Sequence, residues 1–195
     1  MDLAAFFKAE FADHNDVARR TEAALSDAFA KLVQGCTKSV RGGGKLMFFG
    51  NGGSAADAQH LATELTIRYK SDRAAIAAIA LTTDTSALTA AGNDLGFDRI
   101  FARQIEALGR SGDVAVAIST SGKSANIIAA LKQAKAMGLT TAALGGNDGG
   151  AMREHAEHLL VVPSTTTARI QEMHISLGQM LCAALEIELG LAPGR

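Results

Sequence analysis

Tryptophan is absent from this chain of 195 residues, Tyr69 is its single tyrosine, and there are only two cysteines. Cys36 and Cys182 each lie in a helical apolar pattern, which favours reduced core thiols over a disulfide. No apolar run approaches the roughly 20 residues that a membrane-spanning helix needs. The sequence therefore predicts a protein without a disulfide framework and without a membrane partner.

An excess of either charge is also missing. The chain has 19 basic and 20 acidic residues, well mixed, for a net charge of −1. Protein surfaces that bind nucleic acid carry clustered positive charge. Because this chain has no such excess, no direct contact with nucleic acid is expected. The first ten residues contain acids and a lysine in place of the apolar run of a secretory signal. We expect a helix-rich cytoplasmic domain.

A long amphipathic helix is predicted over residues 17–40, where apolar residues recur at spacings of three and four. Phe6, Phe7 and Phe11 add apolar weight before it. This helix precedes any strand–helix unit, so part of its apolar face is expected to contact another subunit. We interpret residues 1–41 as a helical extension used in oligomerisation, within a single domain of residues 1–195.

Short apolar runs and helical patterns alternate after the glycines at 42–44. The expected strands are 45–49, 75–81, 114–119, 140–144 and 158–162. The expected helices are 54–69, 85–91, 98–108, 124–137, 151–156 and 168–189. This alternation predicts an α/β fold, a doubly wound five-stranded parallel sheet with helices on both faces. In the order 2-1-3-4-5, the first and third strands are neighbours and their loops meet at the switch point.

The loops after those two strands are rich in glycine and hydroxyl groups. Residues 50–54 read Gly-Asn-Gly-Gly-Ser, and residues 119–124 read Ser-Thr-Ser-Gly-Lys-Ser. Hydroxyls and backbone N–H groups at a helix N-terminus can hold a phosphate. The first loop matches neither a dinucleotide fingerprint nor a P-loop, and taken alone it could be an ordinary turn. In the second loop, helix capping by Ser124 would explain only one of four hydroxyls.

Several polar residues on the predicted helices have both a chemical and a structural interpretation. His60 and Glu64 share a helix face and could bind a metal or form a surface hydrogen bond. Arg68, one turn further, could anchor a substrate or pair with Glu64. Asn93 and Asp94 are typical of a turn. His174 is typical of a packed helix histidine.

Together these segments resemble the sugar isomerase (SIS) domain family, and within it the phosphoheptose isomerases. The motifs that carry the resemblance lie at residues 50–60, 81–86, 92–94, 118–122 and 169–172. The resemblance implies a homotetramer with sites at subunit interfaces. It also implies isomerisation of sedoheptulose 7-phosphate to D-glycero-D-manno-heptose 7-phosphate through an enediol, a step toward lipopolysaccharide heptose.

The resemblance also implies residue roles. Glu64 would be the base that moves the proton between C1 and C2. One Zn²⁺ per subunit would be held by residues matching His60, Glu64, Gln171 and Gln179. The phosphosugar would contact the two loops, further polar side chains and the last helix, at Asn51, Gly52, Gly53, Ser54, Arg68, Asn93, Asp94, Ser119, Thr120, Ser121, Ser124 and Gln171.

The chain departs from the family pattern at two positions. Gln179 stands where phosphoheptose isomerases carry a histidine that also acts as the acid, and neutral glutamine is a poor acid and a weak zinc ligand. Ala168 replaces an aspartate of some members. A substitute acid, such as His174 or a bound water, is one interpretation. The alternative is a non-catalytic phosphosugar-binding tetramer that binds the replication initiator DnaA, although such proteins tend to lack the glutamate that this chain keeps at Glu64.

Overall fold

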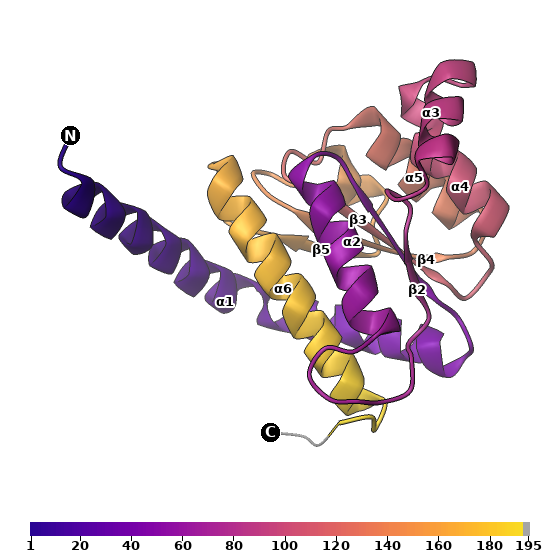
Figure 1. The fold of residues 1–195 in the computed structure, drawn as a ribbon, viewed down its shortest axis with the longest axis horizontal. Helices are drawn as coiled ribbons and strands as arrows, with labels where there is room; N and C mark the ends of the chain where they lie inside the picture. The colour runs from indigo at the N-terminus through magenta and orange to yellow at the C-terminus, as the bar shows by residue number, and fades with distance from the viewer. Residues whose placement is uncertain (193–195) are drawn as a thin grey trace.

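A parallel sheet of five short strands forms the centre of the structure, a computed structural model that describes residues 1–192 (Figure 1). The strands are β1 (Leu46–Gly50), β2 (Ala78–Ala80), β3 (Val114–Ser119), β4 (Thr140–Gly145) and β5 (His158–Val161). All neighbouring pairs are parallel, and the order is β2-β1-β3-β4-β5. The predicted doubly wound topology is confirmed.

Helices cover both faces of the sheet. They are α1 (Leu3–Arg41), α2 (Gly53–Thr66), α3 (Thr85–Asp94), α4 (Ile100–Leu108), α5 (Ala125–Ala136) and α6 (Thr167–Glu188), with 3₁₀ turns η1 (Phe97–Arg99) and η2 (Gly150–Glu154). Helices α1, α2 and α6 pack together on one face. Helices α4 and α5 pack on the other face, and α3 lies against α4. The short helix expected at 151–156 is the 3₁₀ turn η2.

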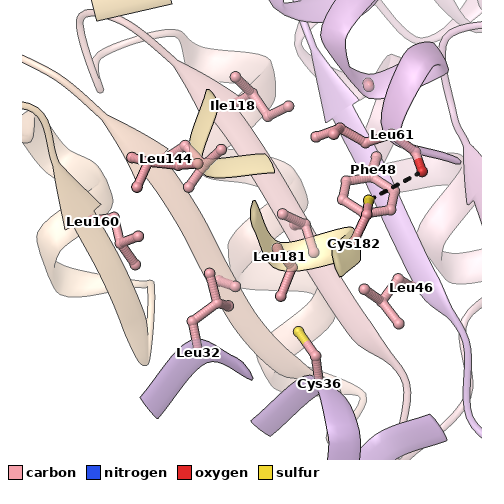
Figure 2. Close-up of a cluster of buried hydrophobic side chains, with 14 of the residues drawn as sticks. Leu32, Cys36, Leu46, Phe48, Leu61, Ile118, Leu144, Leu160, Leu181 and Cys182 are labelled. Atoms are coloured by element: carbon pink, nitrogen blue, oxygen red, sulfur yellow. Dashed lines mark hydrogen bonds between the residues drawn. The ribbon is translucent and has the colours of Figure 1, made fainter. Parts of the chain in front are cut away.

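Alternation of side chains along the strands divides the core into two layers. In β1, Leu46 and Phe48 enter the layer beneath α1, α2 and α6, whereas Met47 and Phe49 enter the layer beneath α4 and α5. Figure 2 shows part of the first layer, where Cys182 from α6 donates to the carbonyl of Leu61 in α2. Cys36 and Cys182 are free and buried, as predicted, and burial raises the pKa of each thiol to about 12.

Helix α1 begins at Leu3 instead of residue 17, because Asp2 caps the N–H groups of Ala4 and Ala5. Its second half packs on α6 and β5, but its first half projects away from the sheet (Figure 1). Phe6, Phe7 and Phe11 are 51–65% exposed there. Within residues 1–192, none of the helices is long and apolar enough to span a bilayer.

Two element ends differ from the sequence prediction because of one buried arginine and one backbone hydrogen bond. Helix α2 ends at Thr66 instead of residue 69, where Arg73 donates to the carbonyls of Glu64 and Leu65, each at 2.8 Å. Strand β2 starts at Ala78 instead of residue 75, because the N–H of Ile76 bonds to the carbonyl of Leu65.

Candidate functional site

The two hydroxyl-rich loops lie side by side at the carboxyl edge of the sheet. Gly50 at the end of β1 is in register with Ile118 near the end of β3, so the loops leave the sheet next to each other. The side chains of Asn51 and Asn126 then join the first loop to the first turn of α5 by two hydrogen bonds of 2.9 Å. The two loops therefore meet at the switch point of the sheet, as the strand order predicted.

The second loop folds back on itself, with two of its hydroxyl oxygens bonded to its own backbone. Ser119 accepts a hydrogen bond from the N–H of Gly122 at 3.2 Å, and Ser121 accepts one from the N–H of Lys123 at 3.3 Å. Ser124 occupies the N-cap position of α5 but makes no capping hydrogen bond. Ser124 therefore holds the predicted N-cap position through its carbonyl, and its hydroxyl makes no hydrogen bond to the helix.

A third loop, residues 146–150, supports the second one from the β4 side. Asn147 donates to the carbonyl of Thr120 at 3.0 Å and adopts a positive φ of 55°. Gly122 has a φ of 64°, and a Cβ atom there would lie 2.2 Å from the carbonyl oxygen of Gly149. The shape of the second loop therefore depends on the absence of a side chain at this contact.

The first loop opens α2 and contacts α6. Gly52, with a φ of 57°, forms the N-cap of α2 without a side-chain capping bond, and Ser54 is buried in the first turn. A Cβ atom at Gly53 would lie 2.7 Å from the amide nitrogen of Gln171. The structure therefore places the predicted residue Gln171 directly against the first loop.

Three of the four predicted metal ligands meet where α2 packs on α6. The Nε2 atom of His60 lies 3.2 Å from Oε1 of Glu64 and 3.2 Å from Nε2 of Gln179. Glu64 is partly buried, with 20% of its side chain exposed. The fourth residue, Gln171, lies beside Gly53. Gly53 precedes His60 by seven residues, which is roughly 10 Å along the axis of α2.

Comparison with known proteins identifies the family. Residues 11–146 match the SIS domain. A phosphoheptose isomerase from Paramagnetospirillum magneticum is 56% identical over 95% of this chain and 97% of its own length. Another from Campylobacter jejuni is 50% identical over 91% of this chain and 95% of its own length. The chain is a phosphoheptose isomerase family member with an SIS domain.

Solved structures of this family have the same fold. The phosphoheptose isomerase GmhA from Neisseria gonorrhoeae superposes with a TM-score of 0.88 at 44% identity, covering 94% of this chain and 98% of that one. A phosphoheptose isomerase from Francisella tularensis gives a TM-score of 0.91 at 34% identity, covering 95% and 98%. The α/β architecture described above is therefore that of the phosphoheptose isomerases.

The donor atoms around His60 can accommodate the zinc ion that the family resemblance implies. Two ligands on one tetrahedral zinc ion, each at about 2.0–2.1 Å, lie roughly 3.3 Å apart. The 3.2 Å spacings from His60 to Glu64 and Gln179 fit this geometry. Rotation of the Gln179 amide by half a turn would present its oxygen in place of its nitrogen. Residues 1–192 contain no cluster of three or more His, Cys, Asp or Glu side chains suited to a metal, so a zinc site here would need glutamine among its ligands.

His174 is not placed to act as the substitute acid in this phosphoheptose isomerase fold. Its side chain is fully buried, and its Nε2 lies 3.0 Å from the carbonyl oxygen of Gly145. A carbonyl oxygen can only accept, so Nε2 carries the proton and donates it there. Burial lowers the pKa of His174 to about 4, and the Gly145 hydrogen bond opposes this only partly. The interpretation of His174 as a replacement acid is wrong.

Within residues 1–192, three predicted site residues make no hydrogen bond or ion pair with the His60 cluster. Arg68 follows the end of α2 and is exposed, so it is not one helical turn beyond Glu64 as predicted. Asn93 and Asp94 form the last turn of α3, joined by a 2.7 Å hydrogen bond, and not a loop turn. Asp94 lines a hollow between α3 and α4 with Arg103.

Sequence reasoning missed a buried ion pair that holds the end of α2. The Nε of Arg73 lies 2.8 Å from Oε1 of Glu186, and each side chain is only 2% exposed. Glu186 also accepts a hydrogen bond from the N–H of Tyr69 at 3.0 Å. Because Arg73 bonds to the carbonyl of Glu64, this pair fixes the backbone that carries the predicted base. A lone arginine in a polar loop gives no such signal in sequence.

Proposed function

We propose that this protein isomerises sedoheptulose 7-phosphate to D-glycero-D-manno-heptose 7-phosphate. Membership of the phosphoheptose isomerase family supports this reaction, and the crevice between the two loops supports a phosphate seat. The single observation that carries the proposal is the position of Glu64, a half-buried carboxylate beside His60 on the helix that begins at the first loop. The relatives reported above are isomerases, so they lend no support to the DnaA-binding alternative.

The phosphate is held by the second loop, through Ser119, Thr120, Ser121 and Ser124, together with the first loop. The N-terminal ends of α2 and α5 both point at this crevice, so their backbone N–H groups favour an anion without a cluster of arginines. Gln171, beside Gly53, contacts the sugar next to this seat. The anchored phosphate fixes the carbon chain relative to α2, which lowers the entropic cost of reaching the reactive geometry.

Glu64 acts as the base. Its carboxylate takes the proton from C1 of the ketose and returns it to C2, so one group serves both halves of the enediol pathway. Gln179 cannot donate a proton near neutrality, and His174 is enclosed, so proton transfer to the sugar oxygens uses water. A zinc ion held by His60, Glu64 and Gln179 would add Lewis-acid polarisation of those oxygens.

Assembly into a homotetramer belongs to the same proposal. The exposed phenylalanines of α1 support it, because a contiguous apolar surface of this kind is typical of an interface. Arg68, Asn93 and Asp94 would then complete a site in an assembled neighbour. We place the enzyme in the cytoplasm, in the supply of heptose for lipopolysaccharide, and two free buried thiols are compatible with a reducing compartment.

Turnover of sedoheptulose 7-phosphate by wild type and by Glu64→Gln tests the proposal. The amide keeps the shape of the side chain but cannot accept the carbon-bound proton, so we expect a loss of kcat of at least about 10²-fold. Inorganic phosphate should still protect Glu64→Gln against thermal unfolding as it does wild type. Turnover by neither protein, with DnaA captured by both, would move the assignment to the binding protein.

A further inference from the structure

The reciprocal amide pair between Asn51 and Asn126 joins segments 75 residues apart in sequence. Each Nδ2 atom donates to the Oδ1 atom of the other residue at 2.9 Å. Asn126 is only 1% exposed, so its amide is bonded to the protein and not to solvent. A buried amide without its partner would incur a desolvation cost, which makes the pairing strongly preferred over either residue acting alone.

The pair lies between the two halves of the phosphate seat. Asn51 immediately precedes Gly52 and Gly53, which open α2, and Asn126 lies two residues after Ser124, in the first turn of α5. The two hydrogen bonds therefore set the separation of the helix N-termini that face the crevice. They also occupy the oxygen of the Asn51 amide and one of its N–H groups, so this side chain is already committed within the protein.

We propose that Asn126 is a positioning residue of the phosphate seat, and that Asn51 serves the phosphosugar through its pairing with Asn126. In the first loop, contact with the phosphate then comes from the backbone N–H groups of Gly52 and Gly53 and from the Ser54 hydroxyl. This inference rests on the proposed function, because it concerns the geometry of the same seat. It assigns a role to a buried residue outside the two glycine-rich loops.

A double-mutant cycle tests the proposal, with Asn51→Ala, Asn126→Ala and the double variant. For each protein, kcat and KM are measured with sedoheptulose 7-phosphate, and the dissociation constant of inorganic phosphate is measured by calorimetry. Each single variant loses the same two hydrogen bonds, so we expect KM and the phosphate constant to rise together by about tenfold. We expect kcat to change by less than about threefold, since the phosphate seat contributes binding and not proton transfer.

The decisive result is the double variant. If the two residues act only as a pair, its KM matches that of either single variant, because the second substitution has nothing further to remove. The proposal would be overturned if the rise in KM of the double variant equalled the product of the rises in the two single variants. That result would show that the Asn51 side chain contacts the substrate independently. An unchanged phosphate constant in Asn126→Ala would overturn it as well.

Two further measurements separate this proposal from protein stability and from the proposed function. Asn126→Leu preserves the buried volume but not the hydrogen bonds, so it should reproduce the KM of Asn126→Ala with less loss of thermal stability. If Asn126 variants do not fold, Asn51→Ala removes the same bonds from the half-exposed side. If wild type binds phosphate without turning over the sugar, the phosphate constants of the cycle still decide the proposal, while the isomerase assignment fails separately.

Discussion

His174 and Gln179 lie five positions apart on α6, yet their side chains enter different environments. Gln179 reaches the exposed side of the helix packing and meets His60. His174 points into the sheet and meets the carbonyl of Gly145. Neither residue supplies an acid beside His60, because His174 is enclosed and the Gln179 amide offers hydrogen bonds but no titratable proton.

Gln179→His should strengthen metal binding, since imidazole is a better ligand for zinc than a carboxamide. The 3.2 Å spacing to His60 places the substituted ring beside the existing ligands. We expect zinc content measured by mass spectrometry to rise toward one ion per chain, and kcat to rise with it. Met180→His is the control, at an exposed position on the same helix to which no ligand role is assigned. Unchanged metal content in Gln179→His would show that another group already completes the site.

His174→Gln should keep activity but change the pH dependence of stability. The folded pKa of His174 is lowered to about 4, whereas in the unfolded chain it lies near its ordinary 6.5. The unfolded state therefore gains a proton first as the pH falls, and stability is lost between pH 6.5 and pH 4. Glutamine retains a donor toward Gly145 but does not titrate. From pH 6.5 to pH 4, the unfolding free energy of the variant should therefore fall by less than that of wild type, by up to roughly 3 kcal/mol.

Denaturant unfolding at pH 7 and pH 4 measures this difference for both proteins. The same variant also tests the mechanism, because an enclosed neutral histidine does not contribute to proton transfer. A fall in kcat of about 10²-fold or more, in a variant that remains folded, would contradict the assignment of His174 as a packing residue.

At the scale of elements, the loops of the site owe their shape to close backbone contacts. The loop after β3 and the loop after β4 approach so closely at Gly122 and Gly149 that no side chain fits between them. On the other side of the site, Arg73 and Glu186 end α2 and hold it to α6. The glycine contact positions the loop after β3, and the ion pair positions helix α2, which carries the proposed base Glu64.

Gly122→Ala should therefore disrupt the phosphate seat. The added Cβ would lie 2.2 Å from the Gly149 oxygen, and the φ of 64° disfavours any side chain. Gly43→Ala is a matched control, because Gly43 has a φ of 82° with no atom within 4 Å of the added carbon. We expect the control to lose about 1 kcal/mol and Gly122→Ala to lose several, with a large rise in KM. Equal losses in thermal unfolding would argue against the loop contact.

At the scale of the whole molecule, the N-terminal part of α1 exposes an apolar surface to solvent. The first half of α1 projects from the sheet and exposes the aromatic pair Phe7 and Phe11, whose ring centroids are 4.8 Å apart. From Val17 onward the helix is anchored in the core, with Leu32 and Cys36 buried beneath it. The helix is thus held rigidly at one end and offers an apolar surface at the other, as an assembly element would.

Phe7→Glu combined with Phe11→Glu should shift the protein to a smaller species in sedimentation velocity. Charge on this surface opposes burial against another subunit, while the core contacts of α1 remain intact. Turnover should fall with assembly, because the proposed tetramer completes each site with residues of a neighbouring subunit. Ala136→Glu, which adds charge of the same sign at an exposed position at the end of α5, is the control and should leave the assembly unchanged. An unaltered sedimentation coefficient in the α1 variant would exclude this interface.

Much of the architecture follows from local sequence patterns. Apolar runs alternating with helical periodicity predicted the sheet, because crossovers are the usual way to join parallel neighbours. The glycine and hydroxyl clusters predicted the crevice, since loops at a switch point must meet. The ends of α2 and β2 were wrong because Arg73 and Leu65 make specific hydrogen bonds there, and propensity carries no information about such distant partners.

The sequence alone determined the family and the strand order, because periodicity and motif spacing are properties of the chain itself. Only the tertiary structure decided which polar groups meet. It paired Asn51 with Asn126, brought Gln179 to His60 and enclosed His174 against Gly145. The physical reason is that a side chain's partner, burial and proton affinity depend on elements folded against it, and these lie far away along the chain.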